Sequence, residues 1–129
     1  MKCETIVILV LGLVLQGCVK YDDPIGYSPL PLSPYSLTFN ANGGEGVVKG
    51  LQGYSIIANS LIIDNKGVID DGDKQTPLVN QWCTVVYNGT SSTVQVSPNE
   101  TGKERRCEIG YADTGRRHFN VVTVVQSGD

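Results

Sequence analysis

The chain has 129 residues and a formal net charge of −3, from 10 lysines and arginines against 13 aspartates and glutamates. This length corresponds to one domain, and the acidic balance gives no overall basic charge to attract nucleic acid. With one histidine, His118, and no G-x-S-x-G motif, the sequence offers no set of residues for a zinc site or a serine hydrolase. We expect His118, beside Arg116 and Arg117, to face solvent, and we expect no enzyme activity and no cofactor.

The N-terminus has the pattern of an export signal. Met1–Lys2 supplies positive charge, and Ile6–Leu15 is an apolar run too short to span a bilayer. The run ends in Leu15-Gln16-Gly17-Cys18, which resembles the lipobox of bacterial lipoproteins. The resemblance implies a signal peptide over residues 1–17 and a lipid on Cys18, which would anchor the protein to a membrane. The alternative is an ordinary signal peptide with a chance cysteine.

The segment after Cys18 is acidic and then rich in proline. Val19–Asp23 resembles the surface-export signal of lipoproteins in some Gram-negative bacteria, which implies the outer face of the outer membrane. A plain polar linker is the alternative. The prolines that follow predict an extended tether over residues 18–34.

From residue 35 onward the signals are those of β-structure. Asn42–Gly44, Asn88–Gly89 and Asp113–Gly115 are typical turns between apolar runs. Between such turns the sequence predicts about seven short strands, at residues 36–40, 46–51, 54–63, 82–87, 93–97, 105–111 and 119–126. We expect a kink near Asn59–Ser60 and a loop or loose hairpin at residues 64–77. The pattern favours an antiparallel β-sandwich over a small barrel.

Two of the four cysteines remain after Cys3 leaves with the signal peptide and Cys18 takes the lipid. Alternation places Cys83 and Cys107 on the inward faces of their strands, where a disulfide bond could join the two sheets. Two buried, reduced thiols are the alternative.

The segment from residue 36 to 128 resembles the BACON family, which are immunoglobulin-like β-sandwich domains of bacterial surface proteins. The matching pieces, in chain order, are Leu37-Thr38-Phe39, Asn42-Gly43-Gly44-Glu45-Gly46, Trp82-Cys83-Thr84-Val85, the turn from Asn99 to Arg105, and Val124-Val125-Gln126-Ser127-Gly128. The resemblance implies one immunoglobulin-like domain over residues 35–129. This chain has Tyr54–Ile57 where family members often carry another tryptophan.

Three polar residues of the matching pieces are expected to be structural. Arg105 would pair with a carbonyl or carboxylate at a strand start, and Asn99 would hold its turn. Gln126, near the end of what we take as an edge strand, would bond to backbone groups.

Sugar binding would need exposed aromatic rings and nearby polar groups. The candidates are Tyr54, Tyr87, Tyr111 and Trp82, although Trp82 is more typical of a core residue. Asp70, Asp71 and Asp73, with Asp64–Asn65, form a weak calcium candidate, and a solvated loop is the alternative.

These observations predict a non-catalytic, lipid-anchored binding module on the cell surface. Its partner would be a glycan or mucin. The alternative is a structural or adhesin-accessory subunit that binds another protein.

Overall fold

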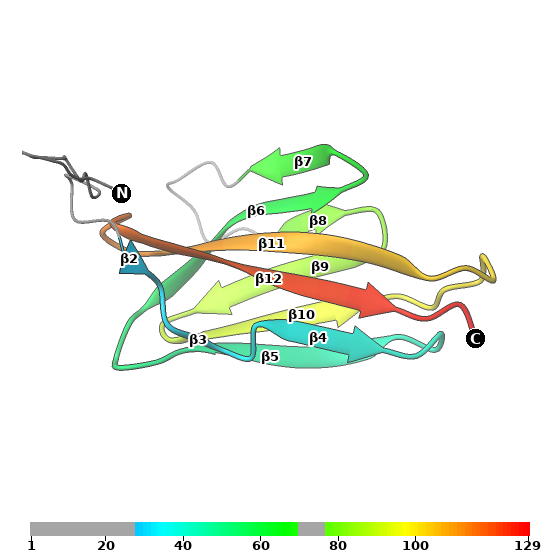
Figure 1. Ribbon diagram of the computed structural model, residues 1–129, viewed down its shortest axis with the longest axis horizontal. Coiled ribbons are helices and arrows are strands. Elements are labelled where there is room, and N and C mark those ends of the chain that lie inside the picture. The colour runs from blue at the N-terminus through cyan, green and yellow to red at the C-terminus, as the bar shows by residue number, and fades with distance from the viewer. Residues whose placement is uncertain (1–27, 70–76) are drawn as a thin grey trace, which may run out of the picture.

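The computed structural model describes residues 28–69 and 77–129, which form two layers of β-sheet (Figure 1). One sheet has five strands, in the order β3 (Leu32–Ser33), β5 (Gly44–Gly50), β10 (Ser91–Val96), β9 (Cys83–Asn88) and β8 (Leu78–Asn80). The other has six: β2 (Ser28–Pro29), β12 (His118–Gln126), β11 (Arg105–Asp113), β6 (Ile56–Ile63) and β7 (Lys66–Ile69) in that order, with β4 (Ser36–Phe39) also paired to β12. The described residues contain no helix. The predicted all-β sandwich is therefore confirmed.

The core lies between the two sheets and is filled from both of them. Along β10 and β12, buried side chains alternate with more exposed ones, as strands with one covered face require. Each large apolar side chain that is fully buried stabilises the fold by about 1.5–3 kcal/mol. The largest such residues are Leu30, Leu32, Ile56, Leu61, Ile109, Tyr111, Val48, Val85, Val94, Val122 and Val124.

The first described residues already belong to the sandwich, which corrects the predicted boundary at residue 35. Leu30 and Leu32 are 0% and 1% exposed, and the Leu30 N–H donates to the carbonyl of Phe119 at 3.0 Å. The proline-rich composition suggested only a spacer. Edge strands nevertheless tolerate proline, because an outward-facing position needs no N–H donor.

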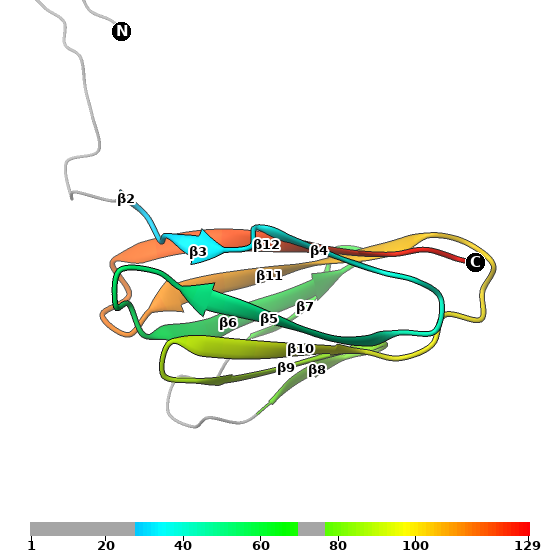
Figure 2. The same cartoon turned by 90° about the horizontal axis from the view of Figure 1, so that it is seen from below.

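This first part of the chain crosses from one sheet to the other and back. β2 pairs with β12, β3 pairs with β5, and β4 returns to β12 (Figure 2). β2 and β4 run parallel to β12, and the other strand pairs are antiparallel. One side of the sandwich is thus closed by a segment that bonds to both layers.

Several predicted turns are present. Gly43 has φ +81°, and a side chain there would place its Cβ 2.2 Å from the Val96 carbonyl oxygen, so this position requires glycine. At the β9–β10 hairpin, Ser91 pairs with Asn88, and Gly89 has φ +61°. The hairpin predicted from Asn88–Gly89 is confirmed, with Gly89 as its first central residue.

The long strand β6 has the irregularity that the sequence predicts. Ala58 pairs with Tyr111 and Ser60 with Gly110, so Asn59 is the extra residue of a β-bulge. Beyond the bulge, β6 continues into a tight hairpin with β7. The described strands therefore outnumber the predicted seven, because β2, β3, β7 and β8 are too short to give a clear pattern in the sequence.

The sandwich has two ends, and we name them for use below. The N-terminal end carries Ser28 and the loops at residues 51–55, 89–90 and 114–117 (Figure 1). The distal end carries the turns at residues 40–43, 64–65 and 81–82, and the loop at residues 97–104. Across the described residues, no helix has the length and apolar character needed to cross a membrane.

Candidate functional site

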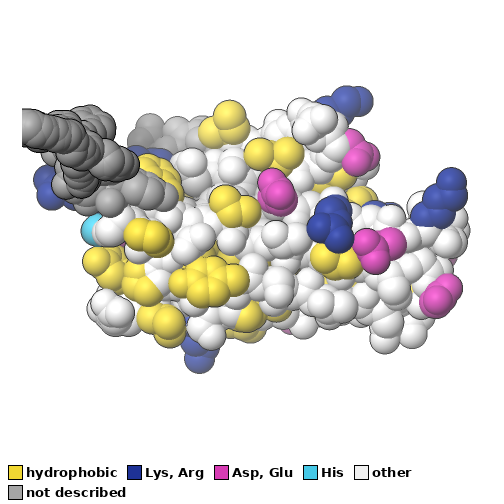
Figure 3. All heavy atoms as spheres, in the orientation of Figure 1, with side chains coloured by type: hydrophobic (Ala, Val, Ile, Leu, Met, Phe, Trp, Pro, Cys, Tyr) yellow, Lys and Arg dark blue, Asp and Glu magenta, His cyan; other side chains and the backbone are white. Residues whose placement is uncertain are grey.

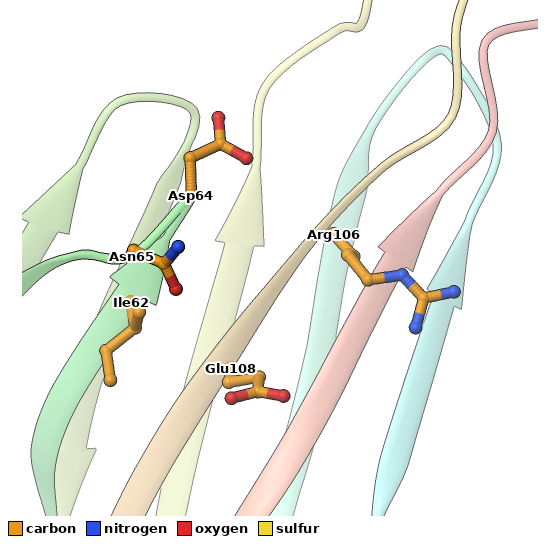
Figure 4. Close-up of a pocket in the computed structure, with 5 residues that line it drawn as sticks. All are labelled: Ile62, Asp64, Asn65, Arg106 and Glu108. Carbon is orange, nitrogen blue, oxygen red and sulfur yellow. The ribbon is translucent and has the colours of Figure 1, made fainter.

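A shallow hollow lies on the outer face of the six-stranded sheet, toward the distal end. It has a volume of about 180 Å³ and is lined by Ile62, Asp64, Asn65, Arg106 and Glu108 (Figure 4). The first three come from the β6–β7 hairpin and the other two from β11. Two elements that are distant in sequence thus form one site.

The hairpin places Asp64 and Asn65 at its tip. Ile63 pairs with Lys66, so these two residues alone form the turn, with φ values of +52° and +65°. A two-residue turn of this kind needs positive φ at both central positions, and aspartate and asparagine tolerate that conformation better than other non-glycine residues. The backbone therefore fixes the positions of their two Cβ atoms, and with them the region that the two side chains can reach.

The β11 side of the hollow is fixed by register. Glu108 pairs with Ile62 across the β6–β11 ladder, so their side chains lie side by side on the outer face. The Arg106 guanidinium points away from the hairpin in Figure 4, and its Nη2 lies 3.3 Å from Oε2 of the exposed Glu104. Arg106 consequently offers the hollow mainly its aliphatic stem.

The chemistry of the hollow suits a ligand rich in hydroxyl groups. Carboxylates accept hydrogen bonds and an amide both donates and accepts them, while Ile62, 38% exposed, supplies an apolar floor. The volume is below the 300–1,000 Å³ usual for sites that enclose a small molecule. The hollow is therefore too small to enclose a small molecule and could contact only part of a ligand.

The four aromatic candidates from the sequence do not gather at this hollow. Trp82 and Tyr111 are 8% and 1% exposed, so neither ring has an open face for a sugar, which corrects their place among the ligand-binding candidates. The Tyr111 hydroxyl lies 2.8 Å from the Ser92 Oγ, and burial raises the pKa of Tyr111. Tyr54 and Tyr87 are half-buried and pack against the core near the N-terminal end.

His118 is half-buried, which corrects the expectation that it faces solvent. Its Nδ1 lies 2.8 Å from the Ser28 Oγ, and its Nε2 lies 3.5 Å from the Tyr54 hydroxyl. The Tyr54 and His118 rings meet edge to face, with centroids 5.1 Å apart. His118 thus links β2 to the loop before β6. Each of its ring nitrogens lies beside a hydroxyl group, whereas the histidine of a catalytic triad has a carboxylate beside one ring nitrogen.

Asp113 is the nearest acid in sequence to His118, but its carboxylate is held by backbone. Its Oδ1 accepts hydrogen bonds from the N–H groups of Arg117 at 2.8 Å and His118 at 2.9 Å. Burial alone would raise the pKa of Asp113, but these N–H donors outweigh it, and the pKa is lowered. Asp113 therefore shapes the β11–β12 turn.

The distal end is held by a network of the residues predicted to be structural. The Arg105 guanidinium lies 4.6 Å from the centroid of the Trp82 ring and donates to the carbonyls of Ser97 and Pro98. Its Nε donates to the Gln126 Oε1 at 2.9 Å. The predicted pairing of Arg105 with carbonyls is confirmed.

Gln126 and Asn99 complete this network. Gln126 is 0% exposed, and its Nε2 donates to the carbonyls of Asn40 and Ser97. Gln126 belongs to β12, which lies between β11 and β4, so the prediction that it lies on an edge strand is wrong. The prediction that its side chain bonds to backbone groups is confirmed. Asn99 donates to the carbonyls of Lys103 and Ser127 and accepts from the Thr101 N–H, as a turn-holding residue should.

Cys83 and Cys107 lie across the core from one another as free, buried thiols. The structure thus shows the second of the two predicted arrangements and no disulfide bond between them. Contact with the Cys83 thiol and burial both raise the pKa of Cys107, which keeps the Cys107 thiol protonated.

The other predicted sites fall outside the described residues. These are the signal peptide, the lipidation residue Cys18, and the weak calcium candidates Asp70, Asp71 and Asp73. Within residues 28–69 and 77–129, no three potential metal ligands come together.

Comparisons with known proteins support the fold but give no function for this chain. No family model and no curated protein matches the sequence. The NMR structure of a protein from Bacteroides thetaiotaomicron superposes with a TM-score of 0.63 at 19% identity, covering 84% of this chain and 95% of that one. A Bacteroides ovatus GH5 xyloglucanase, solved with a XXXG heptasaccharide, gives a TM-score of 0.46 at 18% identity. That match covers 76% of this chain and 18% of the xyloglucanase.

Proposed function

We propose that this chain is a non-catalytic, lipid-anchored binding module of the bacterial cell surface, and that it contacts glycan through the distal hollow. The observation that carries the proposal is the hollow itself. Asp64, Asn65 and Glu108 line it together with the apolar Ile62, toward the end of the sandwich opposite Ser28 (Figure 4). A tethered module is best served by a site at its far end.

The character of the hollow favours a neutral glycan over an anionic one. Two carboxylates line it, and the positive charge of Arg106 is directed to Glu104. Sialylated or sulfated sugars would meet like charge there, whereas neutral hydroxyl groups would find acceptors. Binding of a single unit predicts modest affinity, which several copies on one cell would increase by avidity.

The anchor belongs to the same proposal. Lipid on Cys18 would place the sandwich on a short proline-containing tether at the outer face of the outer membrane. The resemblance to BACON domains, together with the two-sheet architecture, supports an immunoglobulin-like module of a surface protein.

A glycan array followed by titration calorimetry tests the binding site. Asn65→Gly keeps the positive φ of the turn but removes the amide, and Glu108→Ala removes a carboxylate. We expect each to weaken binding of the best glycan about tenfold or more, the usual effect of losing a hydrogen bond to a charged or well-placed group. Glu45→Ala, on the outer face of the five-stranded sheet, is the matched control and should change affinity by less than about twofold.

An array without any glycan that binds would overturn the glycan part of this proposal. So would equal losses from Glu108→Ala and Glu45→Ala. The anchor is tested separately, by the intact mass of protein extracted from membranes. That mass should correspond to a lipidated chain beginning at Cys18, and a mature chain with any other first residue would overturn the anchor.

The second function, assembly with another protein, is favoured by the edge strands β7 and β8. Each carries a large exposed apolar residue, Ile69 at 74% and Val79 at 55%. A partner strand could add to either edge and cover these side chains. This second function would be supported if one protein co-purified with the chain and no glycan on the array bound it. The co-purified protein should then be lost from an Ile69→Lys or Val79→Lys variant.

A further inference from the structure

The two outer faces of the sandwich differ in charge. The face of the six-stranded sheet, drawn in Figure 3, carries acidic and basic side chains toward the distal end. The outer face of the five-stranded sheet has two charged side chains among the described residues, Glu45 and Lys49, both on β5. Its other outward side chains are neutral, namely Ser33, Val47, Val79, Thr84, Val86, Asn88, Ser91, Thr93 and Gln95.

The strand register arranges these outward side chains in rows that cross the strands. Thr93 pairs with Val47 on one side and with Val86 on the other, and these three residues form a central row. Val47 and Val86 are 46% and 37% exposed, so the row presents apolar surface. Lys49 lies in the row toward the N-terminal end and Glu45 in the row toward the distal end. Each is two residues from Val47, which places it about 7 Å from the central row along β5.

This arrangement of charge fits a second copy of the same chain. When two such faces meet about a two-fold axis that runs along the central row, the strands of the two copies are antiparallel. Lys49 of each copy then lies opposite Glu45 of the other copy, so the pair of charges occurs twice. An axis along the strands would instead put the two lysines in one row and the two glutamates in another. Charge complementarity therefore selects the antiparallel pair.

Both charged groups are available for such contacts. Lys49 forms no ion pair with a described residue. Glu45 accepts a hydrogen bond from Gln95 at an exposed site, through Oε2 at 2.9 Å, so its other carboxylate oxygen can accept from a lysine. The complementarity compares two positions on one strand, and it does not depend on the net charge of the segments outside the described residues.

We propose that two copies of this chain associate through the outer face of the five-stranded sheet, antiparallel and about a two-fold axis. Sheets rich in valine and threonine pack face to face at about 10 Å, a separation that a lysine and a glutamate from opposite copies can bridge. The face has fewer residues than the roughly 20–30 a side of a standard interface. We therefore expect a dissociation constant of about 10–100 μM.

Such a pair would leave the distal hollow of each copy uncovered, because the hollow lies on the outer face of the other sheet. The two hollows would face away from each other, and a pair could join two glycan chains if the hollow binds glycan as proposed above. The association itself requires neither glycan nor lipid. It can therefore fail or succeed independently of the proposed function.

Sedimentation equilibrium of residues 18–129 with Cys18→Ser measures the association without a lipid. These residues contain the whole core, which runs from Leu30 to Val124. We expect a monomer–dimer equilibrium, and Lys49→Glu should weaken it at least about tenfold, because like charges then meet at two positions of the pair. The matched control is Lys66→Glu, which makes the same charge change at an exposed position of the other sheet and should have less than about a twofold effect.

A mixture of two variants tests the antiparallel arrangement. Lys49→Glu leaves two glutamates on the outer side of β5, and Glu45→Lys leaves two lysines, so each variant repels itself and attracts the other. We expect mixed pairs to form at least about tenfold more tightly than pairs of either variant alone. Both substitutions in one chain should restore the association to within about threefold of the unmodified chain.

A chain that remains monomeric at about 500 μM would overturn the proposal, as would equal losses from Lys49→Glu and Lys66→Glu. So would a mixture that shows no preference for mixed pairs. The edge strand β7 offers a different contact between copies. If Ile69→Lys abolishes the association and Lys49→Glu does not, the copies meet at their sheet edges, and the proposal is wrong.

Discussion

The two ends of the sandwich are built in different ways. At the distal end, Gln126, Asn99 and Arg105 are bonded mainly to backbone carbonyls of other segments, and Gln126 is completely buried. At the N-terminal end, Ser28, Tyr54 and the half-buried His118 meet through side chains. Buried bonds to backbone are costly to lose, whereas partly solvated side-chain contacts can be replaced by water. The comparison indicates a tightly held distal end, which carries the proposed binding site, and a more adaptable N-terminal end.

The largest expected effect is at Gln126. Gln126→Ala removes donors to the Asn40 and Ser97 carbonyls and the acceptor for Arg105, and it leaves a cavity. We expect the free energy of unfolding in urea to fall by about 4 kcal/mol. The matched variant at the other end is Asn120→Ala, which removes the bond to the Leu30 carbonyl and an exposed bond accepted from the Val121 N–H, and it should cost about 1 kcal/mol. Equal losses of unfolding free energy in the Gln126→Ala and Asn120→Ala variants would contradict a difference between the two ends.

Oxidation of the two core cysteines should increase the difference in stability between the two ends. Cys83 and Cys107 lie toward the distal end, at the starts of β9 and β11, and their thiols are in contact across the core. We expect mild oxidation to join them and to raise the free energy of unfolding by about 3 kcal/mol, mainly by restricting the unfolded chain. Intact mass with and without reductant identifies the bond, and a Cys83→Ala, Cys107→Ala double variant should show no response to oxidant. A fully reduced mass after oxidation would contradict this expectation.

At the N-terminal end, Asp113 gives a smaller, pH-dependent effect. Its pKa is lowered in the folded protein, so its contribution to stability is present above the unfolded value of about 4 and is lost as pH falls through the folded value. We expect Asp113→Asn to cost about 1 kcal/mol at pH 7 and almost nothing at low pH. Urea unfolding of both proteins at the two pH values measures this, and a constant difference would show that the carboxylate charge is unimportant.

Ser28 should give the smallest effect. Ser28→Ala removes the hydroxyl that lies 2.8 Å from the His118 Nδ1, at a partly solvated site. We expect a loss of about 0.5 kcal/mol, with the far-ultraviolet circular dichroism unchanged. A loss comparable with that of Gln126→Ala would mean that the N-terminal end is as tightly held as the distal end.

Local patterns predicted much of the fold, because strands and turns leave signals within a few residues. The turn at Gly43, the bulge at Asn59 and the backbone bonds of Asn99 and Arg105 are of this kind. The prolines before residue 35 were the exception, since the same residues suit both a tether and an edge strand. The strands that pair with this segment lie far along the chain, so the local sequence does not reveal them.

The candidate site was less predictable for the same reason. Alternation correctly puts Arg106 and Glu108 on the face opposite Cys107, because side chains alternate along one strand. Which residue of β6 stands beside Glu108 depends on the register between two strands that are far apart in sequence. A shift of one residue would turn Ile62 inward and abolish the hollow.

The most direct test of the central claim is the mapping of backbone amide NMR shifts while the best glycan from the array is added. We predict that the largest changes occur at Ile62, Asp64, Asn65 and Glu108, with none at Ser28, Leu51 or His118. Shifts that cluster at the N-terminal end, around Tyr54 and His118, would contradict the assignment of the binding site to the distal hollow.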